Sequence, residues 1–409
     1  MNIQKEAGLA RKMDPVLLLA QTIGILAVIN GHYQAAGATI NSFFPYYSWH
    51  MPFFIAVSGV LFGRMAKKKS FLRYLWGKCN TLLFPALFVN FCYGLISVVM
   101  RHYKFISYGS SLSVDSLLLS PFMLNYQFRN DISLWFIFQL FIIEMIANAV
   151  YRIPLKKQKY TDLLILIIAL SLSFFSLEYR RANPHLTREK VLLLRTGFLF
   201  AFFAFGICYE RYIKMLFTNR NRYLLGMGLA VGAQTLLLLL TNWDPYFNTR
   251  DMNLTRQPNS FLPFFTFLTA FFFVFCLCGL LSPLLEKSVL LKFIGSNIRY
   301  VVYHHQFAGI MIGVIALLLC ASGNHGLVPE FDVEPFRTKP WYSFRLSTNG
   351  FGKLPYLFIP FFGPILTSKL INRNPNKKIR FILWCSLLAL ILGFFIITGR
   401  YFQDFLRNA

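Results

Sequence analysis

Eleven apolar stretches, each close to the length of a membrane-spanning helix, constrain the fold of this 409-residue chain more than any other feature. A helix needs about 20 mostly apolar residues to cross the hydrocarbon core of a bilayer. The stretches are 15–36, 48–65, 79–100, 133–153, 161–178, 191–213, 223–242, 260–285, 298–322, 351–372 and 380–400. Two of them are short, 48–65 and 161–178, and three prolines interrupt 351–372. We therefore expect an all-α, polytopic transmembrane helix bundle with about 10–11 membrane-spanning helices.

The composition agrees with a chain that lies in a bilayer. Hydrophobic residues make up 56% of the sequence and charged residues 14%, whereas a soluble domain carries about 25% charged residues. These values argue against a disordered chain, a coiled coil and a soluble globular protein. No polar stretch is long enough to form a separate soluble domain, so we expect one integral membrane domain over residues 1–409.

The net charge indicates how the chain is oriented. Lys and Arg together number 41 and Asp and Glu 16, which gives a formal net charge of +25. In a soluble protein this excess would suggest a nucleic-acid partner. Here the basic residues gather in alternate short loops, such as 67–78 and 152–159, and we expect no nucleic acid to bind. The positive-inside rule predicts a multi-pass protein of the cell (inner) membrane with a cytoplasmic N-terminus, although the basic segment 180–190 departs from the pattern.

Few ionisable side chains lie within or beside the apolar stretches, and such residues are candidates for a functional site. They include His32, His50, Glu144, Arg195, His304 and His305. One histidine alone would be an ordinary packing residue, but four near membrane segments indicate a shared polar cavity, because imidazole moves protons near neutral pH. Glu144 lies midway along its stretch and needs a partner; Arg195 is one candidate, although it could equally extend to the interface.

The cysteines give no sign of a metal site or a disulfide framework. All seven lie in or beside apolar stretches, and the sequence contains no CxxC pair or other metal-ligand spacing. Small apolar packing residues are the simplest interpretation. We expect no metal.

Several short motifs follow one another along the first 310 residues. They are Gly31-His32, the aromatic segment Phe43–Tyr47, His50-Met51-Pro52-Phe53-Phe54, Ser58-Gly59, Leu82-Leu83-Phe84-Pro85, Leu134-Trp135-Phe136, and the late element from Gly295 to Tyr303-His304-His305. In this order and spacing the chain resembles the acyltransferase family 3 integral membrane proteins, which O-acylate sugars and other acceptors.

The resemblance implies an acyltransferase of non-aminoacyl groups. It would transfer an acyl group, most often acetyl, from acyl-CoA to a hydroxyl of a saccharide, polysaccharide or lipid-linked glycan acceptor, without a permanently bound cofactor. His32 would be the base, His50 would orient the acceptor or stabilise the oxyanion, and His304 or His305 would close the cavity together with Glu144. The residues expected to hold the acyl-CoA donor are Gln21, Arg73, Lys78 and Arg195.

The sequence departs from the family pattern at several positions. Leu18 and Gln21 stand where the family usually places an Asp and a basic residue, Asn80-Thr81 replace an Arg, and Ser133 replaces a His. Two other functions therefore stay open. A histidine-lined path would also suit a proton-coupled transporter or exporter, and the losses at positions 18 and 21 would suit a catalytically inactive relative.

Overall fold

The computed structural model describes residues 14–33, 43–65, 70–123, 128, 133–152, 158–242, 247–252, 259–339, 341–346 and 352–408. All regular elements in these ranges are helical. The α-helices are α2 (Pro15–Tyr33), α4 (Tyr46–Met65), α5 (Phe71–Lys78), α6 (Phe84–His102), α7 (Ser120–Met123), α8 (Trp135–Val150), α9 (Gln158–Ala182), α10 (Arg188–Cys208), α11 (Arg220–Leu240), α12 (Leu262–Leu285), α13 (Val289–Ala321), α14 (Val333–Thr338), α15 (Pro355–Asn372) and α16 (Lys377–Asn408). Within the described ranges each of the eleven apolar stretches overlaps one of these helices, which confirms the expected all-α polytopic bundle.

Eight helical spans in the described ranges are long and apolar enough to cross a membrane: α2, α5 joined to α6, α9, α10, α11, α12, α13 and α16. The junction of α5 and α6 is a π-helical turn, Cys79–Leu83, and another such turn, Tyr209–Ile213, extends α10. Helix α8 is apolar but has only 16 residues. The chain is thus a multi-pass membrane protein.

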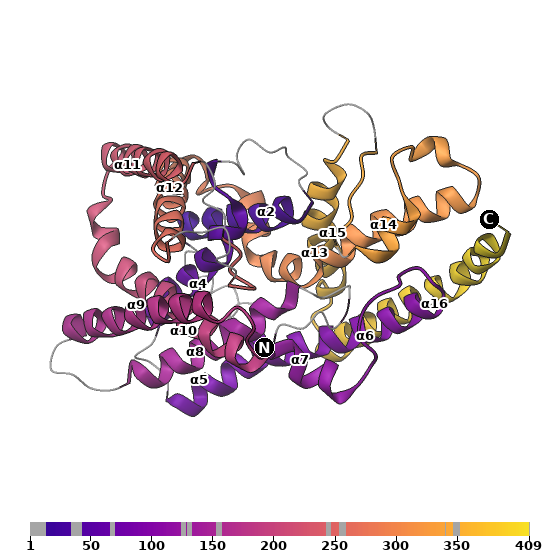
Figure 1. The fold of residues 1–409 in the computed structure, drawn as a ribbon, viewed down its shortest axis with the longest axis horizontal. Helices are drawn as coiled ribbons and strands as arrows, with labels where there is room; N and C mark the ends of the chain where they lie inside the picture. The colour runs from indigo at the N-terminus through magenta and orange to yellow at the C-terminus, as the bar shows by residue number, and fades with distance from the viewer. Residues whose placement is uncertain are drawn as a thin grey trace.

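Helix α2 lies at the centre of the bundle (Figure 1). It contacts α4 and α12 on one side and α13 and α15 on the other. Many aromatic side chains fill the space between these helices and α10, and Phe53, Phe198, Phe203 and Phe271 are fully buried. Because lipid is as apolar as these side chains, close van der Waals packing rather than hydrophobic burial holds such helices together.

Two glycines bring α4 and α10 into backbone contact. A Cβ atom at Gly59 would collide with the carbonyl oxygen of Phe203, and one at Gly206 would collide with that of Ala56. The two contacts are reciprocal, since each glycine faces the backbone of the other helix. Small residues allow this approach in membrane proteins, and here they fix α4 firmly against α10.

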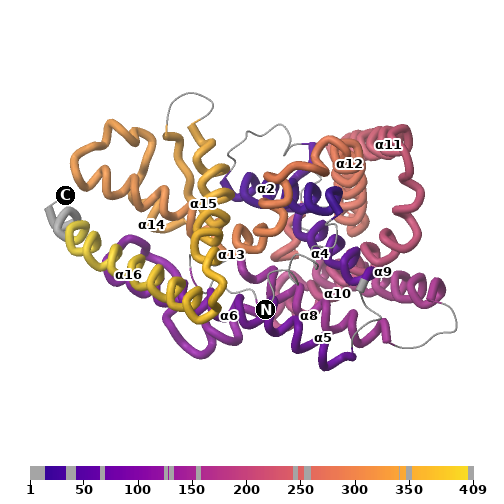
Figure 2. The backbone as a smooth tube through the Cα atoms, turned by 180° about the vertical axis from the view of Figure 1, so that it is seen from behind, coloured from indigo at the N-terminus to yellow at the C-terminus, as the bar shows by residue number. Residues whose placement is uncertain are grey.

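The last helix is the most peripheral part of the bundle. Helix α16 runs along α6 at one end of the molecule, and both views show the two helices side by side (Figure 2). Only 6% of the most apolar window of α16 is buried. An apolar helix with so little protein contact is suited to facing lipid.

Candidate active site

A cavity of about 280 Å³ lies where α2, α4, α13 and the start of α8 meet two connecting segments, 247–252 and 341–346. Its lining combines apolar side chains from α2 and α4 with a group of polar and aromatic ones. Those with chemically active or charged groups are His32, Tyr47, His50, Arg250, Asp251, His305 and Trp341. A concave, mostly apolar site with a few convergent polar groups is the usual form of a small-molecule site.

Chain direction explains why the histidines meet. His32 lies in the last turn of α2, and His50 lies in the second turn of α4, so the two helices bring both residues to the same end of the bundle. His305 lies near the middle of the long helix α13, which packs against α2. The structure thus brings His32, His50 and His305 together, as the shared-cavity hypothesis predicts.

The imidazole of His32 has a polar contact at one nitrogen and aromatic neighbours parallel to its ring. Its Nδ1 lies 3.0 Å from the hydroxyl oxygen of Tyr47. The ring of Trp341 stacks on it with centroids 3.8 Å apart and planes 2° from parallel. The ring of His305 is also nearly parallel, with a centroid distance of 5.7 Å. These contacts define the plane of the His32 ring.

Backbone carbonyls select the tautomers of the other two histidines. His50 donates its Nδ1–H to the carbonyl oxygen of Tyr46, and His305 donates its Nδ1–H to that of Val301 at 2.8 Å. A carbonyl can only accept, so in each neutral ring the proton is on Nδ1 and Nε2 carries the lone pair. The Nε2 of His305 is buried and has no hydrogen-bond partner in the described part of the chain. Neutral His50 and His305 can therefore accept a proton or a hydroxyl hydrogen bond, but they cannot donate one from Nε2.

His304 does not belong to the cavity. Its Nδ1 lies 2.6 Å from the hydroxyl of Tyr93, and its ring stacks on Trp384 of α16 at 5.9 Å. One step along an α-helix turns about 100° around its axis, so His304 and His305 face different neighbours. The sequence left the choice between these two residues open, and the structure places His305 at the site.

Arg195, one candidate partner of Glu144 in the sequence, is not the residue that pairs with it. Glu144 of α8 pairs with Lys78, whose Nζ lies 2.8 Å from Oε1 and 2.7 Å from Oε2. The last turn of α5 packs against α8 and carries this ammonium group to the buried carboxylate. Neither residue lines the cavity, so Glu144 does not converge with His32 as expected.

Arg195 lies behind the cavity wall rather than on it. The side chain is fully buried, and its Nε donates to Gln139 at 2.6 Å. Its Nη1 donates to the carbonyl of Arg250 at 3.3 Å, and its guanidinium carbon lies 5.0 Å from the ring centroid of Trp135. Trp135 and Arg250 both line the cavity, so Arg195 supports two parts of its wall.

The other residues expected to hold the donor also lie away from the cavity. Gln21 is half-buried on α2, and Arg73 is exposed on α5. Lys78 is half-buried with its charge matched by Glu144. None of the three lines the cavity.

Sequence reasoning missed several residues of the site. In the sequence, Trp341 is one of several aromatic residues near the outer ends of helices, and Tyr47 is one residue of an aromatic segment. Neither carries a signal that marks it as part of a site. Arg250 and Asp251 looked like ordinary loop charges; in the structure they pair at 2.9 Å and line the cavity. Their proximity to His32 depends on how the connecting segments fold back, which no local pattern encodes.

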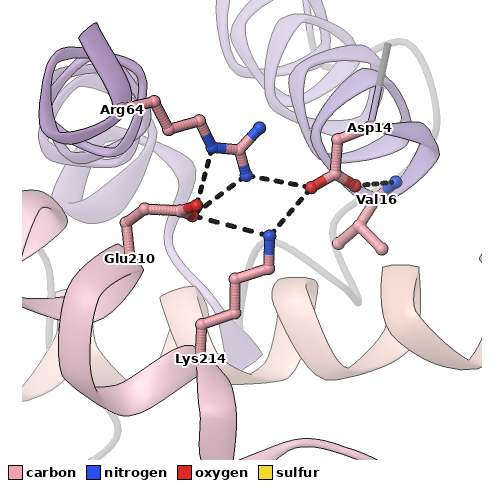
Figure 3. A network of polar contacts seen from close by, with 5 residues as sticks. All are labelled: Asp14, Val16, Arg64, Glu210 and Lys214. Atoms are coloured by element: carbon pink, nitrogen blue, oxygen red, sulfur yellow. Dashed lines mark hydrogen bonds and ion pairs between the residues drawn. The ribbon is translucent and has the colours of Figure 1, made fainter. Parts of the chain in front are cut away.

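Four charged side chains form a network at the opposite end of α2 (Figure 3). Arg64 contacts Glu210 at 2.7 Å and Asp14 at 2.9 Å, and Lys214 contacts the same two carboxylates at 3.5 and 3.0 Å. Asp14 also accepts the backbone N–H of Val16 at 3.0 Å, which caps α2. Burial alone would raise the pKa of the Asp14 carboxyl, but the hydrogen bonds and charges of Lys214 and Arg64 lower it below its ordinary value.

No cluster of three or more His, Cys, Asp or Glu side chains suited to a metal ion occurs in the ranges covered by the structure. The cavity is instead lined by nitrogen bases, one Arg–Asp pair and aromatic rings. Such a set is suited to proton transfer and to binding a ligand that carries hydroxyl groups.

Fold and site together define a class: a multi-pass helical membrane protein with histidines gathered around one cavity. The family model of the acyltransferase domain, acyltransferase family 3, matches residues 17–319, which is most of the chain. The chain therefore belongs to this family and is a membrane acyltransferase. The match includes His32, His50 and His305 and ends before Trp341. No curated protein and no solved structure matches the chain.

Proposed function

We propose that the protein is an O-acyltransferase that transfers an acyl group, acetyl above all, from acyl-CoA to a hydroxyl of a saccharide or lipid-linked glycan. The observation that supports this most strongly is the meeting of His32, His50 and His305 in one cavity within an acyltransferase-family domain. Transfer to a hydroxyl requires a base, and imidazole is the side chain best suited to that role near neutral pH.

His32 is the proposed base. With its proton on Nδ1 it donates to the Tyr47 hydroxyl, and Nε2 takes the proton of the acceptor hydroxyl. The acceptor oxygen then attacks the thioester carbonyl carbon, and a tetrahedral intermediate forms. When this collapses, the carbon–sulfur bond breaks, the ester remains on the acceptor, and the imidazolium returns its proton to the departing CoA sulfur.

The remaining wall residues have complementary roles in this proposal. Nε2 of His50 and of His305 accept hydrogen bonds from acceptor hydroxyls and so hold the acceptor, because neither nitrogen carries a proton in the neutral ring. Stabilising the oxyanion then requires another donor. Arg250, the cation on the wall, is the proposed group.

We further propose that the protein lies in the cell (inner) membrane with its N-terminus in the cytoplasm. Acyl-CoA would approach from the side of the basic loops, where Arg73 lies exposed on α5 and Lys78 ends the same helix. Gln21, on the first part of α2, would be the third residue to hold it. The acceptor would reach His32 from the other end of α2. The alternative function is that of an inactive relative. It is supported by Leu18 and Gln21, which stand where the family usually has an Asp and a basic residue.

The test uses purified full-length protein in liposomes, labelled acetyl-CoA and a mixture of oligosaccharide acceptors. The wild type should transfer label to acceptor or hydrolyse acetyl-CoA, and His32→Ala should lower the rate at least about 100-fold, because general-base catalysis contributes at least this much. His32→Gln should fail equally, since an amide cannot carry the proton. His185→Ala, at an exposed position between α9 and α10, is the matched control and should keep the wild-type rate.

Other outcomes would replace the proposal. Full transfer by His32→Ala would remove His32 as the base. Solute flux through the liposomes without turnover of acetyl-CoA would support a transporter. Acetyl-CoA that binds without turnover would support an inactive relative.

A further inference from the structure

The closest aromatic neighbour of His32 comes from a part of the chain beyond the family match. Trp341 lies after residue 319, where the match ends. Its ring stacks on the imidazole of His32 at 3.8 Å with the planes 2° from parallel. It also lines the cavity. A late connecting segment therefore completes a site whose histidines all lie on helices within the family domain.

The segment that carries Trp341 is fixed to the bundle by the residues that follow Trp341 in the chain. Ser343 donates to the backbone carbonyl of Tyr33 at 3.2 Å, directly after His32 in α2. Phe344 is buried and packs against Tyr356 of α15 with ring centroids 5.9 Å apart. Lys353 donates to Ser343 at 3.3 Å. These contacts hold Trp341 over His32 independently of the stacking itself.

His32 needs such support because its other contacts restrain it only partly. The hydrogen bond that Nδ1 of His32 makes to the Tyr47 hydroxyl fixes one ring nitrogen but leaves rotation about that contact. In His50 and His305 a hydrogen bond to a backbone carbonyl of the same helix fixes the ring, but His32 makes no such bond within the described ranges. A flat ring at van der Waals distance removes this rotation, and a positioned base reacts faster than a free one.

We propose that Trp341 is a positioning residue that holds the His32 imidazole in its reactive orientation and stabilises the imidazolium formed when His32 takes the acceptor proton. The indole face is electron-rich and is the best of the aromatic faces for a cation. The imidazolium of His32 needs this stabilisation because the Arg250 guanidinium, although paired with Asp251, lies on the same cavity wall, and its positive charge repels another cation. This inference rests on the proposed function of His32.

The experiment compares two tryptophans that each stack on a histidine. Trp341→Leu removes the stack on His32, and Trp384→Leu removes the stack on His304, outside the cavity. We expect Trp341→Leu to lower kcat about tenfold while the KM for acetyl-CoA changes less than twofold. Trp341→Phe, which keeps an aromatic face, should restore kcat to within about threefold of the wild type, and Trp384→Leu should keep wild-type kcat.

A second measurement does not depend on turnover. Diethyl pyrocarbonate modifies imidazole nitrogens, and mass spectrometry of the peptide that contains His32 gives its rate. Trp341→Leu should raise this rate at least threefold, because the ring loses its cover and its fixed plane, whereas Trp384→Leu should leave it unchanged. Should Trp341→Leu fail to fold, Trp341→Met replaces it, because the longer, flexible side chain of Met can reach over the His32 ring without an aromatic face.

The outcomes separate this inference from the proposed function. If His32→Ala abolishes transfer but Trp341→Leu has wild-type kcat and an unchanged modification rate, the role of Trp341 is refuted and that of His32 stands. If His32→Ala is fully active, the base assignment fails, and the proposal for Trp341 fails with it. Equal losses of kcat in Trp341→Leu and Trp384→Leu would show a general effect on packing and would also overturn it. In the His32→Ala background, Trp341→Leu should cause no further loss.

Discussion

The two ends of α2 and α4 differ in how their polar groups are satisfied. At one end, Asp14, Arg64, Glu210 and Lys214 neutralise one another in a closed network. At the other end, His32, His50 and His305 have no carboxylate among their hydrogen-bond partners in the described ranges, and one imidazole nitrogen has no partner at all. At the first end the polar groups bond to one another and join helices. At the second end the imidazoles face a cavity that a ligand can fill.

Distance keeps the two ends independent. From Asp14 to His32 along α2 is about 27 Å at 1.5 Å per residue. Substitutions separated by more than about 10 Å and without shared partners usually have additive effects. Changes at the cavity end should therefore alter activity without altering stability, and changes at the network end should do the reverse. The predictions below test this separation, from the largest expected effect to the smallest.

The strongest test uses the two adjacent histidines of α13. His305→Ala should lower the rate of acyl transfer about 100-fold, because the acceptor loses a hydrogen bond that positions it, and should leave the melting temperature close to that of the wild type. His304→Ala should do the opposite, since it removes the hydrogen bond to Tyr93 but no cavity group. Initial rates and thermal melts of both variants show which histidine serves activity and which serves stability. Equal loss of activity in the two would contradict the distinction between them.

The second test breaks the network end. Arg64→Ala leaves the carboxylates of Asp14 and Glu210 with Lys214 alone, and should lower the free energy of unfolding by about 1–2 kcal/mol, between the values of exposed and buried pairs. The rate per folded molecule should not change. Arg181→Ala is the matched control, because it removes an arginine from an exposed pair with Glu178 and should cost less than about 0.5 kcal/mol. Denaturation in detergent measures both, and a fall in the turnover rate of Arg64→Ala would show that the two ends are coupled.

The smallest effect concerns pH. The pKa of Asp14 is lower in the folded protein than its ordinary value, so its ion pairs contribute stability above about pH 4, the usual range for an unfolded Asp. This contribution is lost as the pH falls from there through the folded pKa. The difference in melting temperature between the wild type and Asp14→Asn should thus be largest at pH 6 and shrink as the pH falls below about 4. A difference that does not change with pH would mean that ionisation of Asp14 does not carry the contribution.

The sequence was sufficient to predict features that depend on local composition. Long apolar stretches become helices because the bilayer allows few other structures. Each of the eleven overlaps a helix in the described ranges, and eight spans there are long and apolar enough to cross a membrane. His32 and His50 could also be placed together, because the order of two consecutive helices brings the end of the first near the start of the second. The family motifs added the late histidine pair without distinguishing its members.

The remaining features depend on packing between distant segments. Glu144 has a basic partner as its burial demanded, but several cations could have supplied it, and the contact of α5 with α8 selects Lys78. The choice of His305 over His304 follows from the rotation of α13 about its axis. Trp341 reaches the site through a connecting segment whose path no periodic pattern encodes.

The interlocked glycines of α4 and α10 have a consequence for how the protein is made. Gly206 leaves the ribosome after about 150 further residues have been added beyond Gly59, which at 5–20 residues per second is a delay of roughly 7–30 s. During this time α4 is already synthesised, but the backbone surface that its glycine fits does not yet exist. At the polar start of α4, Ser48 accepts the backbone N–H of Phe247 at 2.7 Å, and Phe247 is synthesised later still. Until that segment arrives, the start of α4 must be tolerated by lipid or held by the insertion machinery.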